Sequence, residues 1–363
     1  MMIITSSAGV FMNKYEIDVK TTLDHFEKTQ WNYRPDPKQI EKYPIITRED
    51  LRNTRMKKGL FSCTTSGSTG ESLTIEKTYG DYIWYIATNI RELRWRKWDV
   101  TKNFALIKPG GKQENTNSWG IPYNIEPLQG KTFKIGHEPI SVIQSWLEEN
   151  NPHYIHGRPS ILKELDLSKI SNLIDTKGTG ELGGTMFSSE ECGTIAMTCP
   201  DNPNVYHVME NQIVEVDTDG GMIITTLTNP YIRRYKNGDC VELGECTCGR
   251  SLQTITKIHG RVRNMFVMPN GDKKWALFGT QEYYSTFGIK KYKLIQTSLT
   301  ELEIHIISEN LREREEELKK HVLKFLGSPI NITIKYVDNF PDYKFEEFIS
   351  LVNIQIMKKQ FYL

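Results

Sequence analysis

The sequence predicts a mixed α/β protein in which a large N-terminal domain of layered sheets and helices precedes a smaller α+β domain. Segments with helical and strand periodicity alternate through the first half of the chain, which favours helices layered on sheets. The C-terminal part of the chain has a different predicted order of elements, which is strand, strand, helix and strand. At 363 residues the chain is long enough for two domains. We therefore expect residues 1–260 to form the large domain and residues 261–363 a small, mobile one.

The elements of the first half follow from the spacing of apolar residues and from capping signals. The first 60 residues read as mostly helical, and Thr47–Asp50 has the composition of a helix cap with acidic residues in the first turn. Asp81–Trp95 has apolar residues at helical spacing and is predicted to be a helix. The pattern then predicts a strand at Phe104–Ile107, a helix at Ile140–Leu147 and a strand starting at Tyr154.

Short strands separated by turns are expected from Val205 onward. Before the domain boundary they are Ile213–Val216, Met222–Leu227, Cys240–Leu243 and an extended segment, Ile255–Met268, interrupted by Gly260. In the tail the pattern predicts strands and one charged amphipathic helix: Lys291–Gln296, Glu301–Ile307, the helix Leu311–Phe325 and the strand Asn331–Val337.

Composition excludes several classes of protein. The chain has 46 basic and 45 acidic residues and a formal net charge of +1, so nothing in it demands nucleic acid or an anionic membrane as a partner. No apolar run approaches the roughly 20 residues that span a bilayer, and the first residues lack the features of a signal peptide. We therefore expect a cytoplasmic protein, in which the six cysteines are metal ligands or free thiols.

The segment Thr64–Leu73, TTSGSTGESL, contains six hydroxyl residues and two glycines. Glycine permits positive φ and close approach of the backbone, and hydroxyls add hydrogen-bond donors, so such a loop can direct several donors toward one anion. It is not a Walker loop, because Gly-x-x-x-x-Gly-Lys-Ser/Thr is absent. On composition alone, a phosphate-binding loop and a flexible surface linker both remain possible.

Several separated segments occur in an order typical of one enzyme family. They are Tyr43–Arg52 (YPIITREDLR), Thr64–Gly70, Met186–Gly193 (MFSSEECG), Arg234–Asp239 (RYKNGD), Cys246–Arg250 (CTCGR) and Ile258–Arg263 (IHGRVR). In this order they resemble the motifs of the adenylate-forming acyl/aryl-CoA synthetase superfamily. Within it, the chain is most similar to the phenylacetate–coenzyme A ligase branch, which includes relatives in capsule and natural-product pathways. The resemblance covers most of the chain and identifies it as a shortened member.

The resemblance implies ATP-dependent adenylation of a carboxylic acid, with release of pyrophosphate, followed by acyl transfer to coenzyme A. Adenylation mainly requires that two anions be positioned and their added charge stabilised. Ser189 would donate to the α-phosphate and Glu190 would bind Mg²⁺ as a hard oxygen ligand. The residues implied to hold the other phosphates are Thr65, Ser66, Gly67, Ser68, Thr69 and Gly70.

The same resemblance assigns the remaining nucleotide contacts. Phe187 would stack near adenine, although the family register places Met186 there. Asp239 would accept hydrogen bonds from both ribose hydroxyls, and Arg261 would support the ribose or a phosphate. The ordinary alternatives are core packing for Phe187, a turn role for Asp239 and a surface position for Arg261.

Two further residues are assigned to conformational change and catalysis. Arg263 occupies the hinge position, where Asp or Lys is usual. Lys344 would be the cation that bridges carboxylate and α-phosphate, although the glycine that usually precedes this lysine is absent. The alternative for Lys344 is a surface lysine.

Cys199, His207, Cys246 and Cys248 occur in an order that in this branch resembles a structural zinc site. Three thiolates and one imidazole form a closed tetrahedral set for Zn²⁺. Such a site would connect the Thr198–Val208 loop to the 244–250 turn. The alternative is a set of separate buried or free thiols.

Several functional alternatives remain open. The acyl group could pass to an amine, a carrier-protein thiol or a sugar instead of coenzyme A, or the chain could be a decayed ligase that only binds nucleotide. His156–Ser160 (HGRPS), Trp119, Gly120 and Tyr123 are candidates for the wall of the acid pocket. Because residues 178–186 run almost directly into the FSSEE segment, we expect this pocket to be trimmed. The sequence names no acid.

Overall fold

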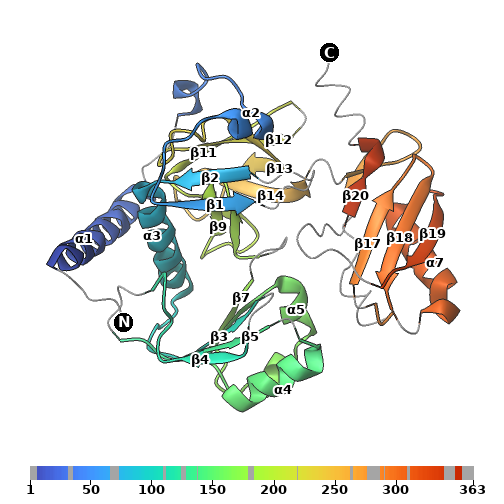
Figure 1. Ribbon diagram of the computed structural model, residues 1–363, viewed down its shortest axis with the longest axis horizontal. Helices are drawn as coiled ribbons and strands as arrows, with labels where there is room; N and C mark the ends of the chain where they lie inside the picture. Colours follow the sequence, from blue (N-terminus) through green and yellow to red (C-terminus); the bar gives the residue numbers. More distant parts are fainter. Residues whose placement is uncertain are drawn as a thin grey trace. The chain divides into compact units, whose positions relative to one another are not determined.

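A computed structural model describes the protein over residues 6–31, 36–65, 73–108, 112–123, 128–136, 138–178, 184–218, 220–261, 265–275, 287–289, 291–308, 311–338 and 348–353. Its contacts divide the chain into two compact units (Figure 1). The first comprises most of the chain up to Ile258, and the second comprises His259–Leu363 together with Ser66–Leu73 and Gly238–Cys240. The architecture is mixed α/β, as the sequence predicts.

The first unit contains a five-stranded sheet in the order β4-β5-β3-β6-β7. Its strands are β4 (Glu114–Thr116), β5 (Thr132–Ile135), β3 (Phe104–Ile107), β6 (Tyr154–Gly157) and β7 (Asp175–Gly178). Strand β3 pairs in parallel with β5 and β6, and β6 pairs in parallel with β7. Parallel pairing of strands connected through helices is the α/β layering expected from the alternating pattern.

Alternate residues of β3 point into two different cores, because side chains alternate across a strand. Ala105 and Ile107 pack with helix α4 (Ile140–Asn150) and with Leu162 of helix α5 (Pro159–Glu164). Phe104 on the opposite face belongs to a core with the helices α1 (Ser6–Thr29) and α3 (Tyr79–Arg96). Both sheet faces are therefore covered.

A second sheet in this unit has the strand order β11-β12-β13-β14-β10-β9-β8. Its strands are β8 (Met186–Ser189), β9 (Gly193–Thr198), β10 (Tyr206–Val208), β11 (Gln212–Val216), β12 (Gly221–Thr226), β13 (Tyr235–Gly244) and β14 (Thr254–Arg261). The pairs β8–β9, β9–β10, β10–β14 and β11–β12 are antiparallel. The sequence predicts β11, β12, part of β13 and β14, but not the β8–β9 hairpin.

Strands β1 (Phe61–Thr65) and β2 (Leu73–Lys77) pair on either side of the hydroxyl–glycine segment. Helix α3 begins immediately afterwards, capped by Thr78, whose side chain accepts from the Asp81 backbone. Thr47 and Asp50 form the expected capping box at the start of helix α2 (Arg48–Asn53). The capping signals therefore mark both helix starts.

The second unit is built around a four-stranded sheet in the order β19-β18-β17-β20. Its elements are β17 (Lys291–Gln296), β18 (Glu301–Ile307), β19 (Asn331–Tyr336), β20 (Phe348–Ser350), the 3-10 turn Arg312–Arg314 and helix α7 (Glu315–Leu326). Strands β15 (Met265–Val267) and β16 (Lys273–Trp275) form a separate hairpin. The strand, strand, helix, strand order expected of the tail is confirmed.

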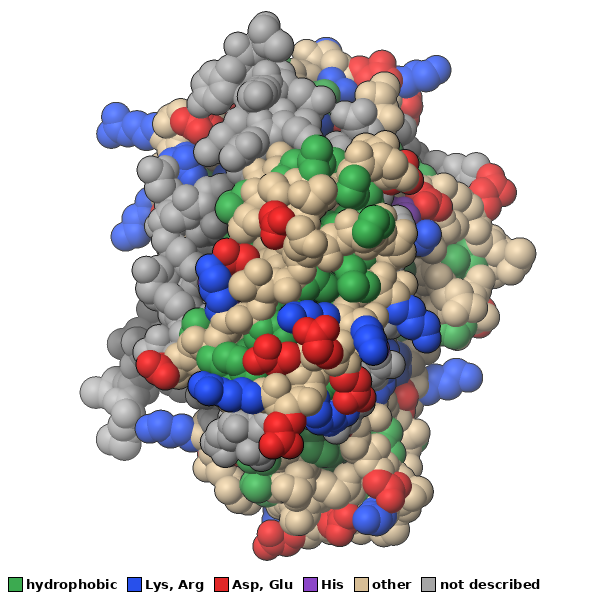
Figure 2. All heavy atoms as spheres, turned by 90° about the vertical axis from the view of Figure 1, so that its right-hand side faces the viewer, with side chains coloured by type: hydrophobic (Ala, Val, Ile, Leu, Met, Phe, Trp, Pro, Cys, Tyr) green, Lys and Arg blue, Asp and Glu red, His purple; other side chains and the backbone are tan. Residues whose placement is uncertain are grey.

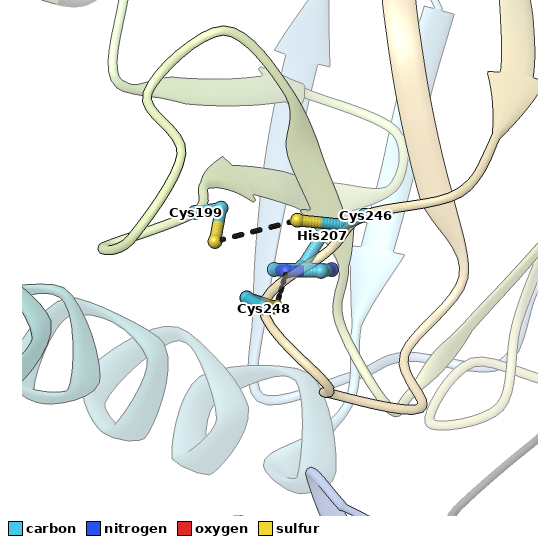
Figure 3. Close-up of side chains that lie close together, drawn as sticks. All are labelled: Cys199, His207, Cys246 and Cys248. Atoms are coloured by element: carbon cyan, nitrogen blue, oxygen red, sulfur yellow. Dashed lines mark hydrogen bonds between the residues drawn. The ribbon is translucent and has the colours of Figure 1, made fainter.

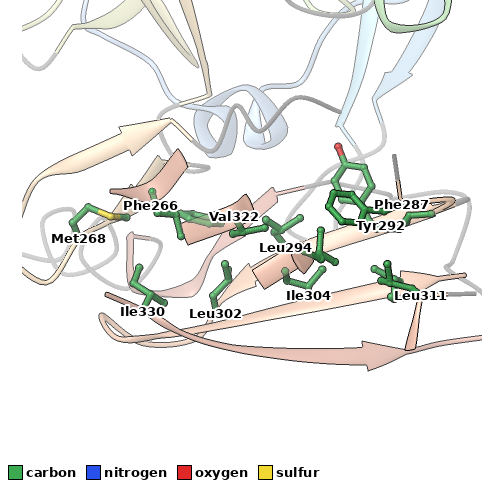
Figure 4. Close-up of a cluster of buried hydrophobic side chains, with 14 residues drawn as sticks. Phe266, Met268, Phe287, Tyr292, Leu294, Leu302, Ile304, Leu311, Val322 and Ile330 are labelled. Carbon is green, nitrogen blue, oxygen red and sulfur yellow. The ribbon is translucent and has the colours of Figure 1, made fainter. Parts of the chain in front are cut away.

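Alternating side chains give this unit its own core (Figure 4). Leu302, Ile304 and Ile306 of β18 are fully buried or nearly so, while the residues between them are half-buried. They pack with Leu318 and Val322 of α7, which are one turn apart on one helix face. Burial of apolar side chains between the sheet and the helix therefore supplies most of the favourable free energy of folding of this unit.

The distribution of charged side chains on the surface agrees with the nearly equal numbers of acidic and basic residues in the chain. Figure 2 shows acidic and basic side chains lying next to one another on the face in view. Within the described residues, no helix combines the length and apolarity needed to cross a membrane.

Candidate functional site

The turn between β8 and β9 presents two of the predicted site residues to solvent. Ser189 ends β8 and is half-buried, and its Oγ accepts a hydrogen bond from the Cys192 N–H at 3.1 Å. Glu190 follows in the turn and is exposed. Gly193 closes the turn with φ +74°, a conformation that favours glycine. A hydroxyl and an accessible carboxylate thus stand side by side, which suits a phosphate and a divalent cation.

Glu191, the next residue, is buried at the centre of a polar network. Its carboxylate lies 2.6 Å from Arg48 Nη1 and accepts a hydrogen bond from Tyr235 Oη at 3.4 Å. Arg48 also donates through Nη2 to Thr65 Oγ1. Lys77 Nζ donates to the Glu191 carbonyl oxygen at 2.7 Å. The network therefore ties the β8–β9 turn to Thr65 and Lys77, which flank the hydroxyl–glycine segment.

Sequence reasoning missed Arg48, Lys77, Glu191 and Tyr235. Each belongs to a segment that was singled out or borders one, but none carries a local signal of burial. Two adjacent glutamates, Glu190 and Glu191, look equivalent in sequence. The turn exposes the first and leaves the second only 6% exposed.

The structure brings Thr65, Ser189 and Glu190 into one connected region, and it leaves other predicted contacts less defined. Phe187 is half-buried on β8, beside Met186, whose Sδ lies 3.6 Å from Thr194 Oγ1. This geometry does not distinguish an adenine contact from packing, so the role of Phe187 stays a prediction.

Asp239 lies half-buried on β13, after Gly238 with φ +86°. Arg261 ends β14, and its side chain is outside the described part of the structure. The residues Ser66, Gly67, Ser68, Thr69, Gly70, Arg263 and Lys344 also lie outside the described residues. Their assigned roles stay predictions.

The four residues expected to form a metal site converge (Figure 3). Cys199 follows β9, His207 lies on β10, and Cys246 and Cys248 lie in the turn between β13 and β14. Their possible ligand atoms all lie within 4.8 Å of one another. Cys246 Sγ and Cys199 Sγ are 3.8 Å apart, and His207 Nε2 and Cys248 Sγ are 3.2 Å apart.

Groups around this cluster orient its members. The backbone N–H of Asp201 donates to Cys199 Sγ, and that of Arg250 donates to Cys248 Sγ, both at 3.4 Å. His207 Nδ1 lies 3.5 Å from Thr254 Oγ1. N–H donors help to lower the pKa of Cys248, whereas burial raises the pKa of Cys199 to about 12 in spite of its donor. A partner for the second ring nitrogen orients the imidazole. All six cysteines are free thiols.

Comparisons with known proteins identify the fold. No family model matches the chain, and no curated protein matches it in sequence. A solved structure of 2-hydroxyisobutyryl-CoA ligase in the postadenylation state with 2-HIB-AMP is 15% identical, covers 96% of this chain and 91% of its own, and has a TM-score of 0.62. The Bacillus subtilis o-succinylbenzoate CoA synthetase with the acyl-adenylate intermediate is 11% identical, covers 78% of this chain and 66% of its own, and has a TM-score of 0.52. The chain has the α/β fold of these two acyl-adenylate-forming enzymes.

Proposed function

We propose that this protein is an ATP-dependent carboxylate ligase that forms an acyl-adenylate and transfers the acyl group to coenzyme A. One observation carries the proposal. The Ser189–Glu190 turn is joined, through Glu191, to both strands that flank the hydroxyl–glycine segment. Ser189 and Glu190 are thus tied to Thr65, the first residue assigned to phosphate binding, in a fold shared with enzymes whose structures contain acyl-adenylates.

In the proposed reaction a carboxylate oxygen attacks the α-phosphorus of ATP. A new O–P bond forms, the bond from that phosphorus to the bridging oxygen breaks, and pyrophosphate leaves with the electron pair. Donors of Thr65–Gly70 hold the β- and γ-phosphates, and the Ser189 hydroxyl donates to the α-phosphate. Glu190, an exposed oxygen ligand, suits Mg²⁺, which neutralises phosphate charge when bound.

The remaining assignments complete the proposal. Phe187 contacts adenine, Asp239 accepts from the ribose hydroxyls, and Arg261 supports the ribose or a phosphate. Lys344 supplies the cation between carboxylate and α-phosphate, on a small domain, residues 261–363, that turns about Arg263. Each role rests on the motif order described above.

Coenzyme A is the favoured acceptor because both structural neighbours are named as coenzyme A ligases or synthetases. The motif order favours the phenylacetate–coenzyme A ligase branch. Transfer to an amine, a carrier-protein thiol or a sugar is the alternative that the same adenylation step would support.

We also propose that Cys199, His207, Cys246 and Cys248 hold a structural Zn²⁺. Two sulfurs bound tetrahedrally at about 2.3 Å from zinc lie about 3.8 Å apart, and the Cys199 and Cys246 sulfurs are separated by 3.8 Å. With four protein ligands the set is closed, so the metal has no position for substrate.

ATP–pyrophosphate exchange over a panel of carboxylic acids tests the ligase proposal. We expect acid-dependent exchange, and Glu190→Gln to reduce it by about a hundredfold or more. Glu149→Gln, which changes an exposed carboxylate on α4, is the matched control and should exchange normally. ATP binding without exchange for any acid would instead indicate a nucleotide-binding module.

The acceptor is tested in a second step with any acid that exchanges. Acyl-CoA formation on adding coenzyme A supports the favoured acceptor. Trapping by hydroxylamine without thioester formation would favour an amine or other acceptor.

A further inference from the structure

Five ionisable side chains gather in the first unit, and two of them, Tyr123 and His156, are candidates for the wall of the acid pocket. They are Tyr85 and Glu92 of α3, Tyr123, His156 of β6 and Lys177 of β7. We call these residues the polar cluster. Groups of this kind are costly to bury, so a gathering of five needs a reason.

Strand register explains how part of the cluster forms. His156 and Lys177 are paired residues of the neighbouring parallel strands β6 and β7, one position from the carboxyl end of each strand. Tyr85 and Glu92 are seven residues apart, about two helical turns, and so share one face of α3. Ligands of open α/β sheets bind outside the carboxyl ends of parallel strands. The polar cluster lies at that edge of the sheet.

The charged members compensate one another. Glu92 and Lys177 form an ion pair in which both side chains are 3% exposed. Thr185 Oγ1 donates to the other Glu92 oxygen at 2.8 Å. The pair therefore carries no net charge, and it offers little to a second carboxylate or to an ammonium group.

The other members are neutral hydrogen-bonding groups. Burial, with a smaller contribution from Lys177, lowers the pKa of His156 to about 3, so its imidazole is neutral at physiological pH. Burial also raises the pKa values of Tyr85 and Tyr123, which keeps both phenols protonated. Among the described residues, neither phenol hydroxyl forms a hydrogen bond.

The cluster is open to solvent on one side. Tyr85 is 44% exposed, although its hydroxyl lies close enough to protein for burial to raise its pKa. His156 is half-buried rather than sealed. A ligand can therefore reach the cluster at Tyr85 and His156, whereas Tyr123 is only 6% exposed.

The cluster also borders the segment assigned to the adenylate. Thr88, between Tyr85 and Glu92 on α3, lies 3.4 Å from Thr194, whose hydroxyl lies 3.6 Å from Met186 Sδ on β8. Thr185, which contacts Glu92, directly precedes Met186. The cluster and the β8 segment assigned to the adenylate are therefore neighbours within the first unit.

We propose that the polar cluster binds the acyl portion of the acid, and that the acid carries an uncharged polar substituent, most simply a hydroxyl group. The inference rests on the proposed ligase function and names its substrate class. The hydroxyls of Tyr85 and Tyr123, which form no hydrogen bond within the described residues, donate to the substituent or accept from it, and the neutral His156 imidazole adds a further polar surface. A pure hydrocarbon chain leaves the two phenol hydroxyls unsatisfied, which is the penalty that discriminates against it.

The test compares matched acids in ATP–pyrophosphate exchange: 3-hydroxybutyrate against butyrate, 2-hydroxyisobutyrate against isobutyrate, and 3-hydroxybenzoate against benzoate. For at least one pair we expect the hydroxy acid to have a kcat/KM higher by about tenfold or more. In the Tyr85→Phe/Tyr123→Phe double variant this ratio should fall below about threefold, with the KM for ATP unchanged.

The control is Tyr79→Phe, on the same helix, whose hydroxyl bonds Asp18 at 2.9 Å and which should keep the wild-type ratio. Exchange that favours the deoxy acids, or an undiminished hydroxyl preference in the double variant, would overturn the polar-cluster proposal while leaving adenylation intact. Failure of every acid in the wild type would instead overturn the ligase function itself.

Discussion

At the scale of single residues, the buried carboxylate of Glu191 is the centre of the candidate site. Its negative charge compensates that of Arg48, whose guanidinium also donates a hydrogen bond to Thr65 Oγ1. The backbone oxygen of Glu191 accepts a hydrogen bond from Lys77 Nζ. Removing Arg48 would leave the buried Glu191 carboxylate without its charged partner. A planar guanidinium can bind two acceptors in fixed directions, which an ammonium cannot do in the same way.

Arg48→Lys should therefore keep the charge but lose the link between Glu191 and Thr65. We expect kcat in pyrophosphate exchange to fall, or the KM for ATP to rise, by about tenfold, while the KM for the acid stays constant. Arg52→Lys, on the same helix and 3.9 Å from the exposed Glu49, is the control. Equal kinetics of the two variants would argue against a positioning role for Arg48.

His156 should make stability depend on pH. Its pKa is lowered from 6.5 to about 3 in the folded protein, so between these values the unfolded chain binds more protons. The free energy of unfolding therefore falls as the pH drops through this window, by up to about 1.4 kcal/mol per pH unit for one proton. Urea unfolding at several pH values between about 6.5 and 4 should show a shallower dependence in His156→Gln. An identical slope would mean that this side chain titrates normally.

At the scale of elements, helix α3 contributes both to an apolar core and to a buried ion pair. Its apolar face, with Ile83, Ile86 and Ile90, packs in the core shared with α1. Its buried Arg91 pairs with Glu210 at 2.5 Å, both side chains being 1% exposed, and lies over the Trp95 ring at 4.5 Å. The helix thus supports the strands near the cysteine–histidine cluster and the polar cluster from one rigid backbone.

The cysteine–histidine cluster connects two further elements, the β9–β10 loop and the β13–β14 turn. We expect about one zinc per chain in the purified protein, and loss of zinc with a lower Tm in Cys248→Ser. Cys63→Ser, on the half-buried β1 thiol outside the cluster, should retain the metal. Metal analysis by mass spectrometry and thermal unfolding provide the measurements. Absence of zinc with all four residues intact would contradict the proposal.

At the scale of the whole molecule, two units with separate hydrophobic cores share one chain. The proposed nucleotide contacts are divided between the units, because Thr65, Ser189 and Glu190 belong to the first and Asp239 to the second. The lysine proposed for adenylation, Lys344, also belongs to the second.

Lys344→Ala should abolish acid-dependent pyrophosphate exchange while leaving the unfolding transition unchanged, because it removes a cation from the charge that develops at the α-phosphate. The expected loss is on the order of a hundredfold or more. Lys324→Ala, which removes an exposed lysine of α7, is the control. Normal exchange in Lys344→Ala would remove this residue from the mechanism.

The sequence by itself determined the features that depend on local physics. Periodicity located α3, β3, α4, β17, β18 and β19, and capping residues located the start of α2. These elements can be located because the residues that face the core recur at a fixed spacing along a helix or a strand. Side chains far apart in sequence could be grouped only where a distinctive chemistry marked them, as it did for the four cysteine and histidine residues that the structure brings together.

Only the tertiary structure decided which charges are buried. Glu190 and Glu191 are adjacent and identical in type, and it is the β8–β9 turn that exposes one and points the other toward Arg48, 143 residues earlier in the chain. The polar cluster likewise unites Tyr85, His156 and Lys177 through strand register and helix packing. Burial of a charge depends on partners supplied by distant segments, so no local pattern of residues encodes it.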